Sequence, residues 1–338
     1  MDLPVFGLKN DNSVCYLNSL LQCLFSSSDL TRYILDEDIE EHKAKKKKHI
    51  TVYYSLINTI VNHPSFKQDS NRLMKVDPRA FKELFVRSST QFTLGMQEDA
   101  DEFLVTALDN LHEDLKMQIN PQKDLDNIDP QIDQNLYQYI QSYKNNYSFV
   151  SRLFHTQVCT KTSCFGCDHS NKKYDNSFQI YLSPTDINCH LYDCLEQFRK
   201  PELLEDYKCD KCNEKNKTTK VSTLSVLPKY VTFVLKRFGG RQQLANVEVP
   251  MTDLDLTQFI NEEDKKSFLK IDAKKYKKFK YRLYGAVFHV GSGLGGHYYA
   301  ICKRKSNWYL FNDEQVQALP NISEDYFNRA YMLFYKRV

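Results

Sequence analysis

The chain has 338 residues, of which 41% are hydrophobic and 26% are charged, a composition that favours a globular protein of one large or two modest domains. Its 46 basic and 43 acidic residues give a formal net charge of +3, too balanced to argue for nucleic-acid binding by charge. The sequence has no long apolar run and no basic, apolar leader. We therefore expect neither a membrane span nor a secretory signal. We therefore expect an intracellular protein, in the cytoplasm or nucleus, whose ten cysteines serve metal or thiol chemistry before disulfides.

Cys15 follows a polar, turn-forming run at residues 7–13 and begins an apolar pattern with helical spacing. That pattern comprises Leu17, Leu20, Leu21, Leu24 and Phe25. A cysteine in the first turn of a helix faces unpaired N–H groups and the positive end of the helix dipole, and both favour the nucleophilic thiolate. This stretch therefore predicts a nucleophile at Cys15. On this stretch alone, the alternative is a small apolar residue that packs the start of a helix.

The rest of the first third is predicted as helices, the clearest of them over residues 97–112. Lysine runs at 43–48 and 274–280 are predicted to be solvated loops or strand edges, and residues 120–147 an insertion or mobile loop. Strand patterns then follow at 178–182, 230–235, 284–289, 298–302, 308–311 and 330–335. Helices first and strands afterwards predict an α+β fold, because alternating βαβ units would intermix them.

Two Cys-x-x-Cys pairs, Cys164/Cys167 and Cys209/Cys212, have the spacing of zinc knuckles. Each pair supplies two thiolates, and two pairs complete a tetrahedral site. The strand-like sequence between the pairs allows them to lie at the tips of neighbouring hairpins. Such a closed site predicts a structural Zn²⁺ rather than a catalytic one, and the alternative is four unrelated thiols.

His297 follows a glycine-rich segment, residues 291–296, and stands at the start of a predicted strand. It is a candidate general base for Cys15, although a lone histidine is more often structural. Residues 308–313 end a later strand with Asn312 and Asp313, and either side chain can accept a hydrogen bond from an imidazole N–H. A thiol, an imidazole and an amide or carboxylate in this chain order are typical of papain-like cysteine proteases.

Several motifs together resemble the catalytic domain of the ubiquitin-specific proteases, a family of cysteine deubiquitinases. Residues 7–10 with 15–22 resemble the family's cysteine box, and residues 97–104 (Gln-Glu-Asp-Ala-Asp-Glu-Phe-Leu) resemble its Gln/Asp/Glu box. Residues 284–300 with 308–313 resemble its histidine box. Residues 235–238 and the two Cys pairs also match, so the likeness spans nearly the whole chain in the expected order.

The resemblance implies one catalytic domain over residues 1–338, with a papain-like α+β fold shaped like a right hand. Residues 1–150 would form a mainly helical thumb, and residues 151–338 the β-rich fingers and palm, with zinc knuckles at about 159–215. The implied activity is thiol-dependent hydrolysis of the (iso)peptide bond after the C-terminal glycine of ubiquitin. The implied partners are ubiquitin and ubiquitinated proteins, with no nucleic acid.

The resemblance also implies residue roles. Cys15 would be the nucleophile and His297 the general base, while Asn312, supported by Asp313, would orient the histidine. Asn10 would help to form the oxyanion hole. Asp99 and Glu102 would meet basic residues of the ubiquitin tail, and Gly295 and Gly296 would leave a narrow channel for its terminal glycines. The full set of implied ubiquitin contacts is Gln97, Asp99, Glu102, Gly295, Gly296 and Tyr298.

One departure from the family pattern precedes the nucleophile, where Asn12-Ser13-Val14 replaces the usual Gly-Asn-Thr or similar. Asparagine tolerates a left-handed backbone, so we expect the turn to persist, with added bulk that affects rate more than fold. Two other functions stay open: a ubiquitin-binding scaffold with little activity, and a zinc-dependent nucleic-acid binder that would leave the cysteine and histidine boxes unexplained. The sequence leaves open the ubiquitin-chain linkage, the protein substrate, a related modifier in place of ubiquitin, and the oligomeric state.

Overall fold

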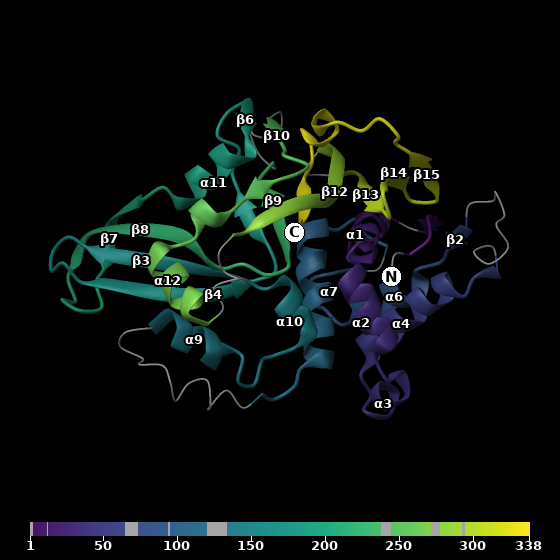
Figure 1. The fold of residues 1–338 in the computed structure, drawn as a ribbon, viewed down its shortest axis with the longest axis horizontal. Coiled ribbons are helices and arrows are strands. Elements are labelled where there is room, and N and C mark those ends of the chain that lie inside the picture. The colour runs from purple at the N-terminus through teal and green to yellow at the C-terminus, as the bar shows by residue number, and fades with distance from the viewer. Residues whose placement is uncertain are drawn as a thin grey trace.

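Helices dominate the first part of the chain and strands the remainder, as the sequence predicts (Figure 1). The structure, a computed structural model, describes residues 3–11, 13–64, 74–93, 95–119, 134–237, 245–271, 278–292 and 295–338. In these ranges no helix combines the length and apolarity that a bilayer span requires. The helices of the first part are α1 (Cys15–Phe25), α2 (Ser28–Asp36), α3 (Ile39–Ala44), α4 (Lys48–Val61), α6 (Arg79–Arg87), α7 (Ala100–Leu115), α9 (Gln134–Ser142) and α10 (Phe149–Phe154).

The largest sheet of the described residues has eight strands and carries the end of the chain. Its order is β15-β14-β13-β12-β16-β9-β5, with β11 paired to β12, and β5–β9 is its one parallel pair among those described. Helix α1 packs against β12, β13 and β14, between this sheet and α7. The strands are β5 (Ile180–Leu182), β9 (Tyr230–Leu235), β11 (Leu254–Asp255), β12 (Lys280–Ser292), β13 (Gly295–Arg304), β14 (Asn307–Asn312), β15 (Gln315–Ala318) and β16 (Met332–Arg337).

A second sheet extends to the left of Figure 1, away from α1 and α7. Its order is β4-β3-β8-β7, and every pair in it is antiparallel. The β3–β4 and β7–β8 turns lie at the same end because β3 and β8 are neighbours. The strands are β3 (Thr156–Cys164), β4 (Ser170–Ser177), β7 (Glu202–Lys208) and β8 (Lys215–Val226).

Shorter elements complete the fold. Two strand pairs are parallel: β1 (Phe6–Leu8) with β2 (Met74–Val76), and β6 (Asn188–His190) with β10 (Asn246–Glu248). The other helices are α11 (Leu191–Arg199) and α12 (Glu262–Ile271), with 3-10 turns at Thr257–Phe259 and Glu324–Phe327. Pairing of β1 with β2 places the chain just before α1 in a fixed position.

Helix α1 is buried along its whole length, which fixes the position of its first residue. A helix that is buried on every side belongs to the core rather than to the surface. The Tyr16 ring packs edge-on against Phe103 of α7, with 5.4 Å between ring centroids. On its other side, Cys23 Sγ lies 3.4 Å from Cys302 Sγ of β13. Cys15 is therefore held by tight packing.

Two sequence predictions differ from the structure. The helix expected over 97–112 begins at Ala100, because the Asp99 side chain accepts a hydrogen bond from the Asp101 N–H and caps it. Part of the loop predicted over 120–147 is wrong, since 134–142 form α9. Ile140 packs against the core and Tyr143 is buried, so apolar residues at helical spacing outweigh the polar composition. Residues 120–133 lie outside the described ranges.

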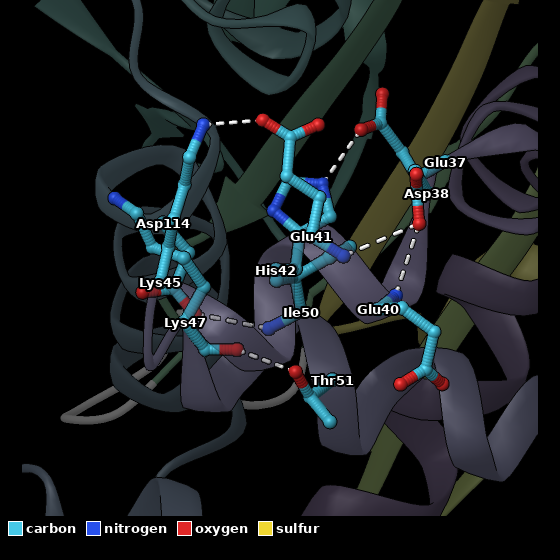
Figure 2. Close-up of polar contacts among 10 residues, drawn as sticks. All are labelled: Glu37, Asp38, Glu40, Glu41, His42, Lys45, Lys47, Ile50, Thr51 and Asp114. Atoms are coloured by element: carbon cyan, nitrogen blue, oxygen red, sulfur yellow. Dashed lines mark hydrogen bonds and ion pairs between the residues drawn. The ribbon is translucent and has the colours of Figure 1, made fainter.

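The first lysine run is the exposed connection between α3 and α4 (Figure 2). Asp38 caps α3 by accepting from the backbone N–H groups of Glu40 and Glu41, and Lys45 pairs with the Glu41 carboxylate. Asp114 of α7 accepts from the Ile50 N–H at the start of α4, at 3.1 Å. Exposed ion pairs of this kind contribute only a few tenths of a kcal/mol, roughly, to stability. The run is largely exposed: residues 45–47 form the predicted loop, whereas Lys43 and Lys48 belong to α3 and α4.

Candidate active site

Cys15 is the first residue of α1, and the prediction that a helix begins there is confirmed. Its side chain is 2% exposed. The Val14 N–H, just before it, donates to Asn10 Oδ1 at 3.1 Å. The left-handed residue of the preceding turn is Ser13, with φ of 58°, and Asn12 lies outside the described residues. Cys15 therefore stands at the N-terminal, positive end of a buried helix dipole.

His297 and Asn312 are joined by a hydrogen bond of 2.6 Å between Nε2 and Oδ1. They come from adjacent antiparallel strands, β13 and β14, in which Ala300 pairs with Phe311. An amide oxygen only accepts, so Nε2 must carry the proton of the neutral imidazole. The free lone pair is then on Nδ1, and that nitrogen is the one able to take a proton from a thiol.

Asp313, the residue after Asn312, accepts hydrogen bonds from two asparagine amides. Its carboxylate accepts from Asn10 Nδ2 at 2.7 Å and from Asn18 Nδ2 at 2.8 Å. Asp313 adopts φ of 50°, a left-handed conformation that aspartate tolerates in a tight turn between β14 and β15. The structure thus gives adjacent residues different partners: Asn312 holds the imidazole, and Asp313 holds Asn10.

A close backbone contact brings Asp313 to the segment before α1. The Leu8 N–H donates to the Asp313 carbonyl oxygen at 2.9 Å. A Cβ added at Gly7 would lie 2.4 Å from the backbone oxygen of Glu314, so only glycine permits this approach. Strand β1 and the β14–β15 turn are therefore locked together, and Asn10 is positioned between them.

Gln97 connects the cysteine and histidine segments. Its Nε2 lies 3.8 Å from Cys15 Sγ and also donates to the Gly296 carbonyl, while its Oε1 accepts from the Gly296 N–H at 3.0 Å. A Cβ on Gly296 would lie 2.3 Å from His289 Nε2, so the hairpin requires glycine there. Gly295 also lies against Gln97, since a Cβ added at Gly295 would be 3.6 Å from Gln97 Oε1. One exposed amide thus touches both the Cys15 sulfur and the residue before His297.

Asp99 and Tyr298 also belong to this region. Asp99 Oδ1 accepts from the Tyr331 hydroxyl at 2.9 Å and from the Tyr298 hydroxyl at 3.5 Å. Burial, and then the Asp99 charge, raise the pKa of both tyrosines, which therefore remain neutral donors. Glu102 is exposed on α7. The structure brings together Gln97, Asp99, Gly295, Gly296 and Tyr298, whereas it records no contact of the Glu102 side chain with them.

Sequence reasoning missed Asn18, Tyr331 and the contact of Gln97 with the sulfur. Asn18 is 2% exposed in a helix that is buried throughout, and it also donates to the Lys9 carbonyl at 3.1 Å. A polar residue amid a run of leucines was the available signal, because buried amides require partners. Tyr331 carried no comparable signal, since an aromatic residue in a strand pattern predicts core packing.

The two Cys-x-x-Cys pairs meet at the tips of β3–β4 and β7–β8, where neighbouring hairpins were predicted to place them. The ligand atoms of Cys164, Cys167, Cys209 and Cys212 all lie within 4.8 Å of one another, and Cys167 Sγ is 3.7 Å from Cys209 Sγ. Four thiolates on one Zn²⁺ at about 2.3 Å stand roughly 3.8 Å apart, so the donor set fits that ion. Backbone N–H groups of Cys212 and Lys211 lower the pKa of Cys209 to about 7, which favours the ligating thiolate.

Comparison with known proteins gives a consistent family assignment. A family model described as ubiquitin carboxyl-terminal hydrolase matches residues 6–335. Ubiquitin carboxyl-terminal hydrolase 5 of Saccharomyces cerevisiae is 29% identical over 366 aligned positions, which cover 100% of this chain and 45% of that protein. Ubiquitin carboxyl-terminal hydrolase 4 of Vanderwaltozyma polyspora is 30% identical, over 98% of this chain and 41% of that protein. The chain thus spans less than half the length of these curated relatives.

Solved structures with a similar fold include two SAGA deubiquitinating modules. One, a variant module of Ubp8, Sgf11, Sus1 and Sgf73 bound to monoubiquitin, matches with a TM-score of 0.72 and 22% identity, covering 99% of this chain and 69% of that chain. The other, a module of the same four proteins bound to ubiquitin aldehyde, matches with a TM-score of 0.69 and 23% identity, covering 99% and 70%. These likenesses confirm the predicted papain-like α+β fold.

Proposed function

The chain belongs to the ubiquitin carboxyl-terminal hydrolase family, and from this membership we propose that it is a thiol-dependent deubiquitinase with Cys15 as its nucleophile. The observation that carries the proposal is that three distant segments of the chain meet beside Cys15. Gln97 touches both Cys15 and Gly296, His297 is oriented by Asn312, and Asp313 fixes the amide of Asn10. A nucleophile, an oriented base and a polarised donor are the groups that acyl transfer requires.

The proposed reaction begins when His297 Nδ1 takes the proton of the Cys15 thiol. The thiolate attacks the carbonyl carbon of the last ubiquitin glycine, and the carbonyl electron pair moves onto oxygen. The C–N bond then breaks, and the lysine amine leaves with the proton from the imidazolium. Water activated by the neutral imidazole hydrolyses the thioester, which releases the ubiquitin carboxylate and restores the thiol.

Asn10 is proposed to stabilise the oxyanion that forms in each half of the reaction. Its Oδ1 accepts from the Val14 N–H and its Nδ2 donates one hydrogen to Asp313, so the amide is held at both ends. The second hydrogen on Nδ2 is then a preoriented donor. Loss of one such donor from an oxyanion hole typically costs about 10²–10³ in kcat.

The four clustered cysteines are proposed to bind a structural Zn²⁺ at the hairpin tips of the β4-β3-β8-β7 sheet. Bound there, zinc would supply four Zn–S bonds that join two hairpins, with no open position for chemistry. The sheet that carries it extends away from helix α1, which begins at Cys15 (Figure 1). We propose that zinc keeps this sheet in the conformation that contacts ubiquitin.

Hydrolysis of ubiquitin bearing a fluorogenic amide at its C-terminal glycine tests the proposed function. The native chain is expected to release the fluorophore, and parallel reactions with related modifiers are expected to be much slower. Ubiquitin binding without turnover would instead support the inactive scaffold. Release from a related modifier but not from ubiquitin would assign the site to that modifier.

Separate roles for Asn312 and Asp313 give a second prediction. Asn312→Ala is expected to lower kcat by about 10²–10⁴, because the imidazole loses the acceptor that fixes its tautomer and orientation. Asp313→Ala is expected to lower kcat through Asn10, while its pH dependence keeps the native midpoint because the imidazole is still paired. The measurement is the pH profile of kcat for both variants. Native turnover in Asn312→Ala would move the orienting role to Asp313.

A further inference from the structure

Asn216, the second residue of β8, lies beside the cluster of four cysteines. Its side-chain Nδ2 donates to Cys212 Sγ at 3.5 Å. Asn216 pairs with Tyr207 across the β7–β8 hairpin, close to the turn that carries Cys212. The amide therefore belongs to a paired strand, whereas the sulfur belongs to the turn before it. This contact holds the Cys212 side chain against β8.

Two other sulfurs of the cluster accept hydrogen bonds from the backbone. The Gly166 N–H donates to Cys164 Sγ and the Lys211 N–H donates to Cys209 Sγ, each at 3.4 Å. A backbone donor persists whatever side chain the residue carries, but the donor to Cys212 exists only because residue 216 is an asparagine. A substitution at this position can thus change the surroundings of one ligand without replacing any ligand.

The Asn216 amide also packs against Gly166, which lies within the other Cys-x-x-Cys pair. A Cβ added at Gly166 would lie 2.5 Å from Asn216 Nδ2 and 2.6 Å from its Cγ, so the amide occupies the space that a larger residue would need. Beside this contact, the Phe165 N–H donates to the Lys217 carbonyl at 3.0 Å and holds the first pair over β8. One side chain therefore contacts both pairs.

An amide donor suits a thiolate that binds a metal. Four thiolates around one Zn²⁺ leave the site with excess negative charge, and N–H donors to sulfur reduce the cost of that charge. An amide donates without adding a charge of its own. A carboxylate of the same shape has no hydrogen to donate and would repel the sulfur.

We propose that Asn216 is a positioning residue of the zinc site, which fixes the Cys212 thiolate for the metal and joins the two Cys pairs. The inference rests on the zinc binding proposed above and adds to it a residue that is not a ligand. Without the Asn216 amide all four thiols remain, but one of them loses the contact that orients it. Zinc should then be held less tightly and be released faster.

Competition for Zn²⁺ between the full chain and a chromophoric chelator tests the inference. Asn216→Asp keeps the shape of the side chain but removes the donor, and it should weaken zinc binding by about 10–100-fold, the usual effect of losing such a contact. Asn213→Asp is the matched control, because it adds the same charge on an exposed residue next to Cys212. The control should bind zinc with nearly native affinity.

A double-mutant cycle tests whether Gly166 acts through the same amide. Gly166→Ala keeps all four cysteines and every backbone donor, but its Cβ should displace the Asn216 side chain and weaken zinc binding. Asn216→Ala removes the amide altogether. In that chain, Gly166→Ala should cause no further loss, because nothing remains for the added methyl group to displace.

Cobalt(II) in place of zinc reports on the sulfur atoms directly. A thiolate without an N–H donor gives up electron density to the metal more readily. The sulfur-to-cobalt charge-transfer absorption of Asn216→Ala should therefore lie at longer wavelength than that of the native chain. If Asn216 served only to pack the hairpin tips, the affinity would fall while this absorption stayed in place.

The outcomes separate this inference from the zinc site itself. Native zinc affinity in Asn216→Asp, an unmoved cobalt absorption in Asn216→Ala, or a full effect of Gly166→Ala in the chain that lacks the amide would overturn the role of Asn216 and leave the metal site in place. A native chain that binds no stoichiometric zinc would overturn both, whereas its hydrolysis of ubiquitin is measured independently.

Discussion

Cys15→Ala is expected to reduce ubiquitin C-terminal hydrolysis by about 10⁴-fold or more, because covalent catalysis has no second route in this site. Truncation removes the attacking sulfur and leaves the His297–Asn312 pair without a proton to accept. The side chain is small and 2% exposed, and α1 is held by packing along its length, so the fold should persist. The measurement is steady-state release from a ubiquitin C-terminal amide.

Binding supplies the control for that variant. Cys15→Ala should bind ubiquitin with nearly native affinity, since the contacts proposed for the tail come from residues 97–102 and from β13. Cys23→Ala, on the same buried helix and two turns further along it, is a second control that tests whether any loss comes from packing alone. Residual turnover above a few per cent in purified Cys15→Ala would mean that another group is the nucleophile.

Loss of the proposed zinc should have the second large effect. It should destabilise the β4-β3-β8-β7 sheet rather than slow the chemical step. Cys209→Ser, or a strong chelator, is expected to abolish stoichiometric zinc and to raise amide hydrogen exchange sharply in the β3–β4 and β7–β8 tips. Structural zinc contributes an apparent binding free energy of about 10–16 kcal/mol in small zinc-finger peptides, so these hairpins should lose their native pairing without it. Ubiquitin affinity should fall as well.

Cys189→Ser is the matched control, because Cys189 is a partly exposed cysteine that belongs to no ligand group of the described residues. It should retain one zinc per chain and native exchange in both hairpin tips. Exchange in the tips that stays native after complete metal removal would show that the four thiols are not a structural site.

Most of the fold follows from local patterns in the sequence. The structure has the Cys15 helix, the five strands predicted from 230–235 onward and the predicted hairpin placement of the Cys pairs. Apolar spacing and turn residues act over short distances, which is why these elements can be predicted. Helix α9 was not predicted, since its polar composition resembles a loop and its packing partners come from distant parts of the chain.

The candidate site shows more clearly what local sequence patterns cannot predict. Cys15, His297 and the Asn312-Asp313 pair could be predicted from their chemistry and their order in the chain. The sequence could not show which residue of that pair holds the imidazole. That choice depends on the left-handed turn at Asp313 and on the approach of Gly7 to Glu314, which are tertiary contacts. The hydrogen bonds of the buried Asn18 amide to Lys9 and Asp313 are likewise tertiary contacts.

The most direct test of the convergence at Cys15 is covalent capture by ubiquitin that carries an electrophile at its C-terminus, followed by peptide mapping of the native chain. One ubiquitin should attach to each chain, at Cys15 alone among the ten cysteines, and His297→Ala should slow the capture strongly. An adduct at any other cysteine, or no adduct from a chain that hydrolyses ubiquitin, would contradict the account.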